Sequence, residues 1–150
     1  MSSATVLFET SHFFVEPCES CPLPGYLIVR AKVAVPSLAL LSPSAAIELG
    51  PLLQRVVRAV EDVVRPLRVY VAQFGEENHD LHFHVFPRTR PLTREYLRWF
   101  PEQRALVHGP GLLDWSREHY RTKAAPERTV RALRDIRDAL AAGHRRGSMP

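Results

Sequence analysis

Residues 80–85 alternate between polar and apolar side chains, and this alternation constrains the fold more than any other stretch of the chain. Leu81, Phe83 and Val85 stand between Asp80, His82, His84 and Phe86. Successive side chains of a β-strand point to opposite faces. We therefore predict a strand with one apolar face and one face that carries two histidines about 6.6 Å apart along the strand. Such a pair could bind one phosphate or one metal ion.

The remaining periodicities predict an α+β fold with an antiparallel sheet. Strand patterns occur at residues 6–9, 12–16, 25–30, 67–74 and 81–86, the last ended by Pro87. Helix patterns occur at residues 43–65, 93–100, 101–107, 114–121 and 126–142. Strands come first, followed by one long helix, a hairpin and further helices. Because strands and helices do not alternate regularly, a parallel sheet is not indicated.

Prolines and glycines indicate where these elements begin and end. Ser42 should cap the long helix, and Gly50-Pro51 should kink it or split off its first turn. Gly109-Pro110-Gly111 should break the chain, and Gly143 should end the last helix. We expect a single domain over residues 1–150. It would comprise a core over about residues 5–90, a helical extension over about 91–143 and a flexible tail over 144–150.

Composition narrows the class of protein and its partners. Hydrophobic residues make up 45% of the 150 positions, and no apolar run is long enough to cross a bilayer. Two cysteines and the absence of a signal-peptide pattern favour the cytoplasm. The first 87 residues carry six Lys/Arg and nine Asp/Glu, whereas the remainder carries fourteen and seven. A basic half is compatible with a polyphosphate, but interspersed acidic residues favour a solvated helix surface and argue against nucleic acid.

Residues 81–88, with the sequence LHFHVFPR, resemble the signature of the histidine-triad (HIT) family. That signature is His-φ-His-φ-His-φ-φ, where φ is hydrophobic, and Pro-Arg often follows it. The strand PGYLIV at residues 24–29 is similar to the family's Pro-Gly-His strand, and a Leu-Ser-Pro helix start precedes the histidine hairpin as in the family. The resemblance covers about residues 12–90.

The resemblance implies a HIT-like fold, usually a homodimer, that hydrolyses or transfers nucleotidyl groups of a dinucleoside polyphosphate or nucleotide conjugate. His82 aligns with the middle histidine, which attacks the α-phosphorus and forms a nucleotidyl-histidine intermediate. His84 aligns with the last histidine. A neutral imidazole is a good nucleophile near pH 7, and a neighbouring imidazole can hydrogen-bond the phosphoryl oxygen. No cofactor or resident metal is expected.

Several positions depart from the family pattern. Asp80 replaces the first triad histidine, although its main-chain carbonyl could still orient His82. The turn at residues 75–79 is short and acidic and lacks the family's Gly-Gln-Ser/Thr stretch. Gln73 stands near the family's asparagine, Tyr26 replaces a histidine, and Glu16 could match the residue that holds the ribose. We expect Asp80, Gln73 and Glu16 to contribute to substrate binding.

Two alternatives remain open at the level of sequence. The protein could be a catalytically lapsed HIT-like protein that binds a nucleotide or a protein partner, as Asp80 suggests. His82, His84 and Asp80 could instead bind a metal, although three alternate positions on one strand spread along it. Cys18 and Cys21 could form half of a zinc site, but a pair of reduced loop cysteines is the simpler interpretation.

Overall fold

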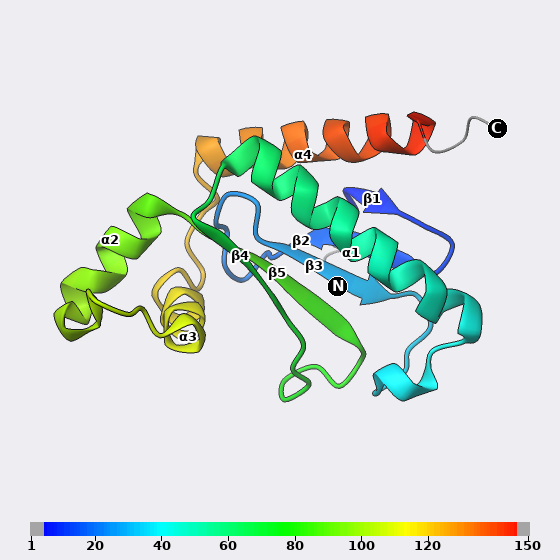
Figure 1. The fold of residues 1–150 in the computed structure, drawn as a ribbon, viewed down its shortest axis with the longest axis horizontal. Coiled ribbons are helices and arrows are strands. Elements are labelled where there is room, and N and C mark those ends of the chain that lie inside the picture. Colours follow the sequence, from blue (N-terminus) through cyan, green and yellow to red (C-terminus); the bar gives the residue numbers. More distant parts are fainter. Residues whose placement is uncertain (1–4, 147–150) are drawn as a thin grey trace.

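The computed structural model describes residues 5–146, which form a five-stranded antiparallel sheet flanked by helices (Figure 1). The strands are β1 (Phe8–Glu9), β2 (Phe13–Pro17), β3 (Leu27–Ala31), β4 (Arg68–Ala72) and β5 (His82–Arg88). Their order across the sheet is β1-β2-β3-β5-β4, and each neighbouring pair is antiparallel. The predicted α+β class with an antiparallel sheet is confirmed, as is the hairpin that carries the histidines.

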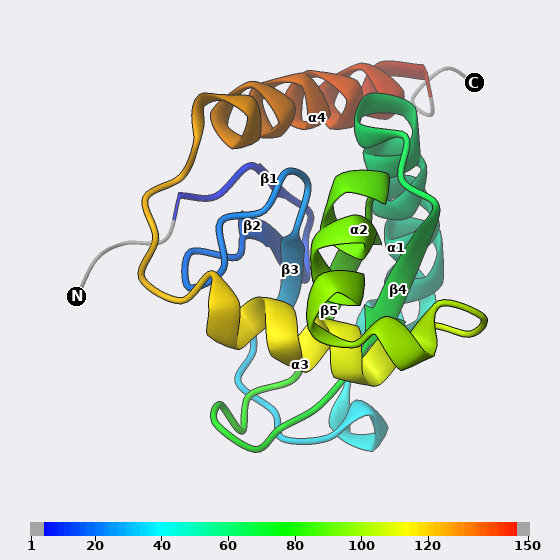
Figure 2. The ribbon, with the colours of Figure 1, turned by 90° about the vertical axis from the view of Figure 1, so that its left-hand side faces the viewer.

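Helices α1 (Pro43–Val64) and α4 (Glu127–Arg146) cover one face of the sheet (Figures 1 and 2). The Ser42 side chain caps α1 by accepting a hydrogen bond from the Ala45 N–H at 3.2 Å. The apolar stripe of α1 then packs on the apolar sides of the strands. This main core includes Val15, Val29, Leu52, Val56, Val60, Leu81, Phe83, Val85, Ile136 and Leu140. Leu81, Phe83 and Val85 therefore lie on the face that their alternation predicts.

Helices α2 (Arg90–Trp99) and α3 (Gly109–His119) lie together, away from α1 and α4 (Figures 1 and 2). They form a second core with the opposite face of the sheet. Its members include Cys21, Tyr26, Phe86, Tyr96, Leu112 and Leu113. Because Tyr26 and Phe86 alternate with residues of the main core, the two cores lie on opposite sides of the sheet.

Gly25 allows the chain to enter β3 at a tight point beneath the helices. Its φ of 79° is left-handed, and a Cβ at this position would lie 2.7 Å from Cγ2 of Val64. The same Cβ would lie 3.5 Å from the side chain of Ile136 in α4. Only glycine combines this backbone conformation with this close approach.

Pro87 does not end β5, contrary to the sequence prediction. β5 continues to Arg88, and Pro87 pairs with Val69 of β4. The Arg88 carbonyl accepts from the Leu67 N–H, so the backbone groups of Arg88 face the β4 side. The nitrogen of Pro87 consequently faces the β3 side, where pairing has already ended at Val85 and Leu27. A missing N–H costs no ladder hydrogen bond there.

The helices also differ from prediction where proline or glycine was expected to interrupt them. α1 is one continuous helix, so Pro51 does not split off its first turn; Leu49 before it and Leu52 and Val56 after it are all buried in the core. The Gly109-Pro110-Gly111 segment begins α3 instead of breaking the chain, since proline is well accommodated in a first helical turn. Residues 101–107 form only a short 3₁₀ turn, η2 (Pro101–Gln103).

The final helix extends past its predicted end. α4 continues through Gly143 to Arg146, so glycine does not act as a stop. Of the expected flexible tail, residues 147–150 lie outside the described residues. A short 3₁₀ turn, η1 (Leu38–Leu40), precedes α1.

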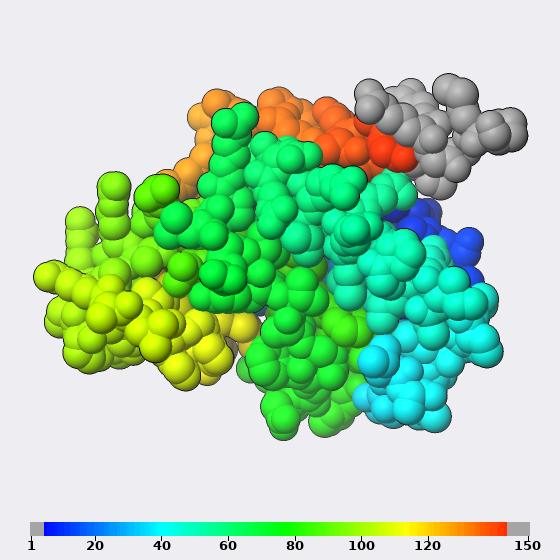
Figure 3. Space-filling view, viewed as in Figure 1, coloured from blue at the N-terminus to red at the C-terminus, as the bar shows by residue number. Residues whose placement is uncertain are grey.

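The molecular surface shows where the histidine hairpin reaches solvent. In Figure 3 the turn between β4 and β5, drawn in green, projects beside the cyan segment that precedes α1.

Within residues 5–146, no helix has the length and apolar character needed to cross a membrane.

Candidate active site

The strand register brings both histidines beside charged side chains from distant parts of the chain. His82 pairs with Arg30 of β3, and His84 pairs with Ile28. Ile28 in turn pairs with Glu16 of β2. Facing residues of adjacent strands project from the same side of a sheet. Glu16, Arg30 and the two histidines therefore share the face opposite α1.

The ring of His82 is oriented by the backbone. Its Nδ1 lies 2.7 Å from the main-chain oxygen of Asp80. A carbonyl oxygen can only accept a hydrogen bond, so Nδ1 carries the hydrogen and the neutral ring has its lone pair on Nε2. Within residues 5–146, Nε2 has no hydrogen-bonding partner. This tautomer leaves Nε2 available as a nucleophile.

His84 is buried and is held by a tyrosine. It is 5% exposed, and its Nδ1 lies 2.8 Å from the hydroxyl of Tyr26. Burial, together with the smaller effects of the neighbouring His82 and Arg117, lowers the pKa of His84 to about 4. His84 is consequently neutral at pH 7. Its ring centroid lies 5.0 Å from that of His82.

A cavity of about 340 Å³ opens over the two histidines. It is lined by Glu16, Pro17, Cys18, Glu19, Ser20, Ile28, Arg30, Asn78, His82, His84 and Arg117. The lining comes from β2, β3, β5, the loop after β2, the turn between β4 and β5, and helix α3. Segments widely separated in sequence therefore form one cavity.

Glu16 and Arg30 form a two-point ion pair on the floor of this cavity. The Nη2 atom of Arg30 donates to Oε1 of Glu16 at 2.7 Å, and Nε donates to Oε2 at 3.2 Å. Glu16 is buried, with 7% of its surface exposed. The paired charges largely neutralise one another, and burial favours their fixed geometry.

The predicted substrate-binding residues lie in different surroundings. Glu16 lines the cavity, whereas Asp80 is exposed and contributes its carbonyl oxygen to His82. Gln73 is exposed, its amide donates to the main-chain oxygen of Phe74, and it does not line the histidine cavity. His79 is an exposed turn residue whose Nδ1 lies 2.8 Å from the Gly75 oxygen.

Three residues of the site escaped sequence reasoning as site residues: Tyr26, Arg30 and Arg117. Alternation along β3 and the residue before it would have placed Tyr26 and Arg30 on one face, but only the structure shows that Arg30 pairs with His82 and that Tyr26 contacts His84. Arg117 lies on α3, and no local pattern indicates that this helix reaches the histidines.

The cysteines do not complete a metal site within the described chain. Cys18 and Cys21 are buried and free, and the Cys21 thiol lies 3.5 Å from the Ser116 oxygen. Among residues 5–146, no three His, Cys, Asp or Glu side chains are arranged to hold a metal ion. The proposed ligand set of His82, His84 and Asp80 therefore lacks the required arrangement.

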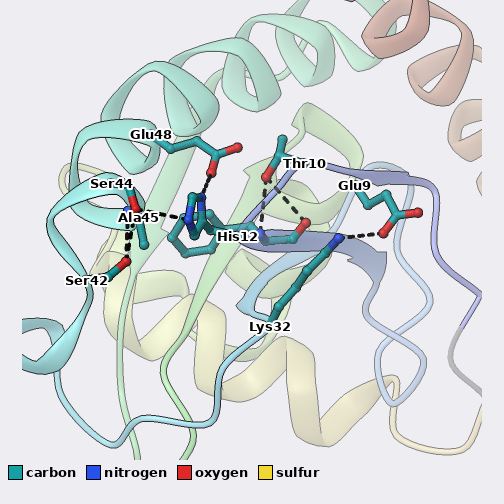
Figure 4. Close-up of polar contacts among 9 residues, drawn as sticks. Glu9, Thr10, His12, Lys32, Ser42, Ser44, Ala45 and Glu48 are labelled. Atoms are coloured by element: carbon teal, nitrogen blue, oxygen red, sulfur yellow. Dashed lines mark hydrogen bonds and ion pairs between the residues drawn. The ribbon is translucent and has the colours of Figure 1, made fainter.

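A second polar cluster, centred on His12, joins the β1–β2 turn to the start of α1 (Figure 4). His12 Nδ1 lies 2.5 Å from Oε2 of Glu48, and its Nε2 lies 3.1 Å from Oγ of Ser44. The order hydroxyl, imidazole and carboxylate is that of a hydrolytic triad. The adjacent cavity of about 280 Å³ is lined by Glu48 but reaches neither Ser44 nor His12. The cluster therefore lacks a place for a substrate beside its hydroxyl, and we assign it a structural role.

Comparison with known proteins identifies the fold. No family model and no curated protein matches the sequence. Solved structures do match, with a TM-score of 0.66 to a hypothetical histidine triad nucleotide-binding protein from Sulfolobus tokodaii, which is 14% identical. A Zn-bound histidine triad family protein from Mycobacterium smegmatis matches with a TM-score of 0.61 and 18% identity. A histidine triad protein from Bradyrhizobium japonicum matches with a TM-score of 0.61 and 15% identity.

These matches span nearly the whole chain. They cover 96%, 97% and 93% of this protein and 88%, 89% and 89% of the respective structures. The chain therefore has a HIT-like fold, as the histidine motif predicted. The likeness extends beyond residues 12–90 into the C-terminal helices, which the sequence resemblance did not cover.

Proposed function

We propose that the protein hydrolyses or transfers nucleotidyl groups through a covalent intermediate on His82. The substrate would be a dinucleoside polyphosphate or another nucleotide conjugate. The observation that carries this proposal is the contact between His82 Nδ1 and the Asp80 carbonyl, because it directs an unprotonated Nε2 toward the cavity. The HIT-like fold of the solved structures adds support by analogy.

In the first step, Nε2 of His82 attacks the α-phosphorus and forms an N–P bond. The P–O bond to the leaving group breaks, and that oxygen departs with the electron pair. His84 stays neutral at pH 7 because burial lowers its pKa to about 4. If the Tyr26 hydroxyl donates to Nδ1, then Nε2 of His84 carries a hydrogen and can donate to the phosphoryl oxygen.

In the second step, water or an acceptor hydroxyl attacks the same phosphorus. The N–P bond breaks, its electron pair returns to Nε2 of His82, and the proton of the attacking group passes to solvent. The imidazole is regenerated in its starting tautomer because the Asp80 carbonyl still holds Nδ1. This order of steps allows either hydrolysis or transfer.

The substrate-binding roles belong to the same proposal. Each carboxylate oxygen of Glu16 is bonded to Arg30 and retains acceptor capacity for a ribose hydroxyl. Asp80 would act through its carbonyl, and its exposed carboxylate would repel an incoming phosphate. Gln73 would reach a substrate only if the turn after β4 rearranged, since it lies outside the histidine cavity in this structure. A cytoplasmic homodimer is part of the proposal as well.

A catalytically lapsed nucleotide-binding or partner-binding protein is the second candidate. Asp80 favours it, because its carboxylate stands where the first triad histidine is expected, and Glu76 and Glu77 add negative charge nearby. This candidate predicts nucleotide binding by calorimetry without product. It also predicts that Asp80→His raises turnover.

Trapping the intermediate tests the first candidate directly. The protein is mixed with a dinucleoside polyphosphate, quenched in alkali within one turnover and digested for mass spectrometry. We expect the nucleotidyl group on His82 and the same labelling in His79→Ala, whose side chain is in the exposed turn. Turnover without any label on His82 would contradict the mechanism, and nucleotide binding without turnover would favour the lapsed protein.

A further inference from the structure

Arg117 reaches the histidine cavity from a helix that is fixed firmly in the second core. Its neighbour Ser116 is fully buried, and the Ser116 hydroxyl donates to the Leu112 oxygen at 2.7 Å. Leu112 and Leu113 are also buried. The buried side of α3 fixes the helix, so Arg117 is held at the cavity wall beside a rigid backbone.

The charge of Arg117 is poorly matched by the protein itself. Its Nη2 lies 3.5 Å from Oε2 of Glu77, whose side chain is 77% exposed. An exposed pair at this distance contributes little and is easily exchanged. Arg30, the other guanidinium of the cavity, is bound at two points by Glu16. Among the described residues that line the cavity, Arg117 is therefore the guanidinium that a ligand can engage at least cost.

Arg117 lies beside the two histidines and faces the same cavity. It lines their cavity, and its positive charge contributes to the lowered pKa of His84. The turn on the other side offers the acidic side chains Glu76 and Glu77. The Arg117 guanidinium on α3 could donate two parallel hydrogen bonds to the oxygens of a phosphate bound in this cavity.

We infer that Arg117 binds a phosphate of the leaving group, and that the site therefore prefers polyphosphate substrates over nucleotide amidates. This inference rests on the proposed reaction at His82. When the leaving group carries phosphate, its oxygens displace Glu77 from the guanidinium. A neutral amine leaving group has no oxygen to place there and gains nothing from Arg117. Glu77 competes with the substrate and thereby sets the affinity.

Comparing two substrates in one variant tests the assignment. We expect Arg117→Gln to lower kcat/KM for diadenosine tetraphosphate roughly 10-fold to 100-fold, the range for one charged hydrogen-bonding group. The variant should lower kcat/KM for adenosine 5′-phosphoramidate less than about 3-fold, and Arg117→Lys should restore part of the loss. Arg121→Gln is the matched control, because Arg121 pairs with exposed Glu118 at 3.1 Å and does not line the cavity.

Removing the competitor should have the opposite effect. Glu77→Gln frees the guanidinium, so KM for the tetraphosphate should fall about 2-fold to 5-fold, in keeping with a weak exposed pair. Glu76→Gln carries the same charge change on the same turn and should not reproduce the decrease. Equal losses on both substrates in Arg117→Gln, or no loss on the tetraphosphate, would overturn the assignment.

A binding measurement can test the phosphate site at Arg117 separately from the proposed reaction at His82. If the unmodified protein turns over neither substrate, the proposed function fails, and calorimetry with inorganic tripolyphosphate then tests Arg117 alone. Weaker binding in Arg117→Gln with an unchanged thermal midpoint supports the phosphate site. Equal binding by the variant, or no binding by the unmodified protein, counts against it.

Discussion

His12 and His82 illustrate two uses of the same side chain. His12 has both ring nitrogens engaged, one by Glu48 and the other by Ser44, so its ring joins the β1–β2 turn to α1 (Figure 4). His82 has one nitrogen engaged by a backbone carbonyl and the other directed to a cavity. An imidazole whose partners are complete inside the protein contributes stability. One with a single fixed partner keeps a nitrogen for chemistry.

The largest expected effect separates these two histidines by turnover. His82→Ala removes the proposed nucleophile and should reduce kcat by at least about 1000-fold. His12→Ala should leave kcat within about 2-fold but lower the free energy of unfolding by about 1–3 kcal/mol, since it removes the hydrogen bonds that the ring makes to Glu48 and Ser44. Steady-state kinetics and denaturant unfolding of both variants provide the measurement. A comparable loss of turnover in His12→Ala would break the comparison.

The next effect concerns the buried partner of His82. The pKa of His84 is about 4 in the folded protein and about 6.5 in the unfolded chain. As the pH falls from about 6.5 toward 4, the unfolded state binds a proton that the folded state does not, and stability decreases. Below about pH 4 both states are protonated and this contribution levels off.

Thermal midpoints at pH 7 and pH 5 measure this contribution. His84→Asn lacks the titrating ring, so its midpoint should fall less between the two pH values than that of the unmodified protein. The exposed His79 is the control, and His79→Asn should keep the full decrease. An identical decrease in the His84 variant would show that other groups carry the pH dependence.

The smallest expected effect concerns the cluster of Ser44, His12 and Glu48, whose order resembles that of a hydrolytic triad. Ser44→Ala removes the hydroxyl that lies 3.1 Å from His12, and we expect a loss of about 0.5–1 kcal/mol in unfolding free energy, because the contact is exposed. Hydrolysis of nucleotide substrates and of simple esters should be unaffected. Loss of an esterase activity in this variant would reveal a second catalytic site.

The sequence was informative wherever a local period decides the outcome. Period-two alternation was sufficient to place His82 and Phe83 on opposite faces, and the start of α1, with Ser42 as its cap, was predicted correctly. Pro87 was misjudged as the end of β5, because the cost of a proline in a strand depends on where strand pairing ends. Rules that use only the local sequence leave out the packing and strand pairing around such a residue.

The site was only partly predictable for a related reason. His82 and His84 lie within one strand, so spacing indicated that they share a face, and the family resemblance indicated that the Asp80 carbonyl orients His82. The pairs Tyr26–His84 and Glu16–Arg30 depend on the strand register, and Arg117 depends on how α3 docks. Those are long-range properties that composition and periodicity do not encode.

The packing at Gly25 links the far side of the sheet to the position of His84. The next residue, Tyr26, holds His84 at 2.8 Å, while Gly25 itself is pressed against Val64 on the far side of the sheet. One added methyl group among the α1 and α4 side chains would shift the start of β3 and carry His84 with it. A substitution at Gly25 would therefore disturb the histidine cavity from the far side of the sheet, although Gly25 does not line that cavity.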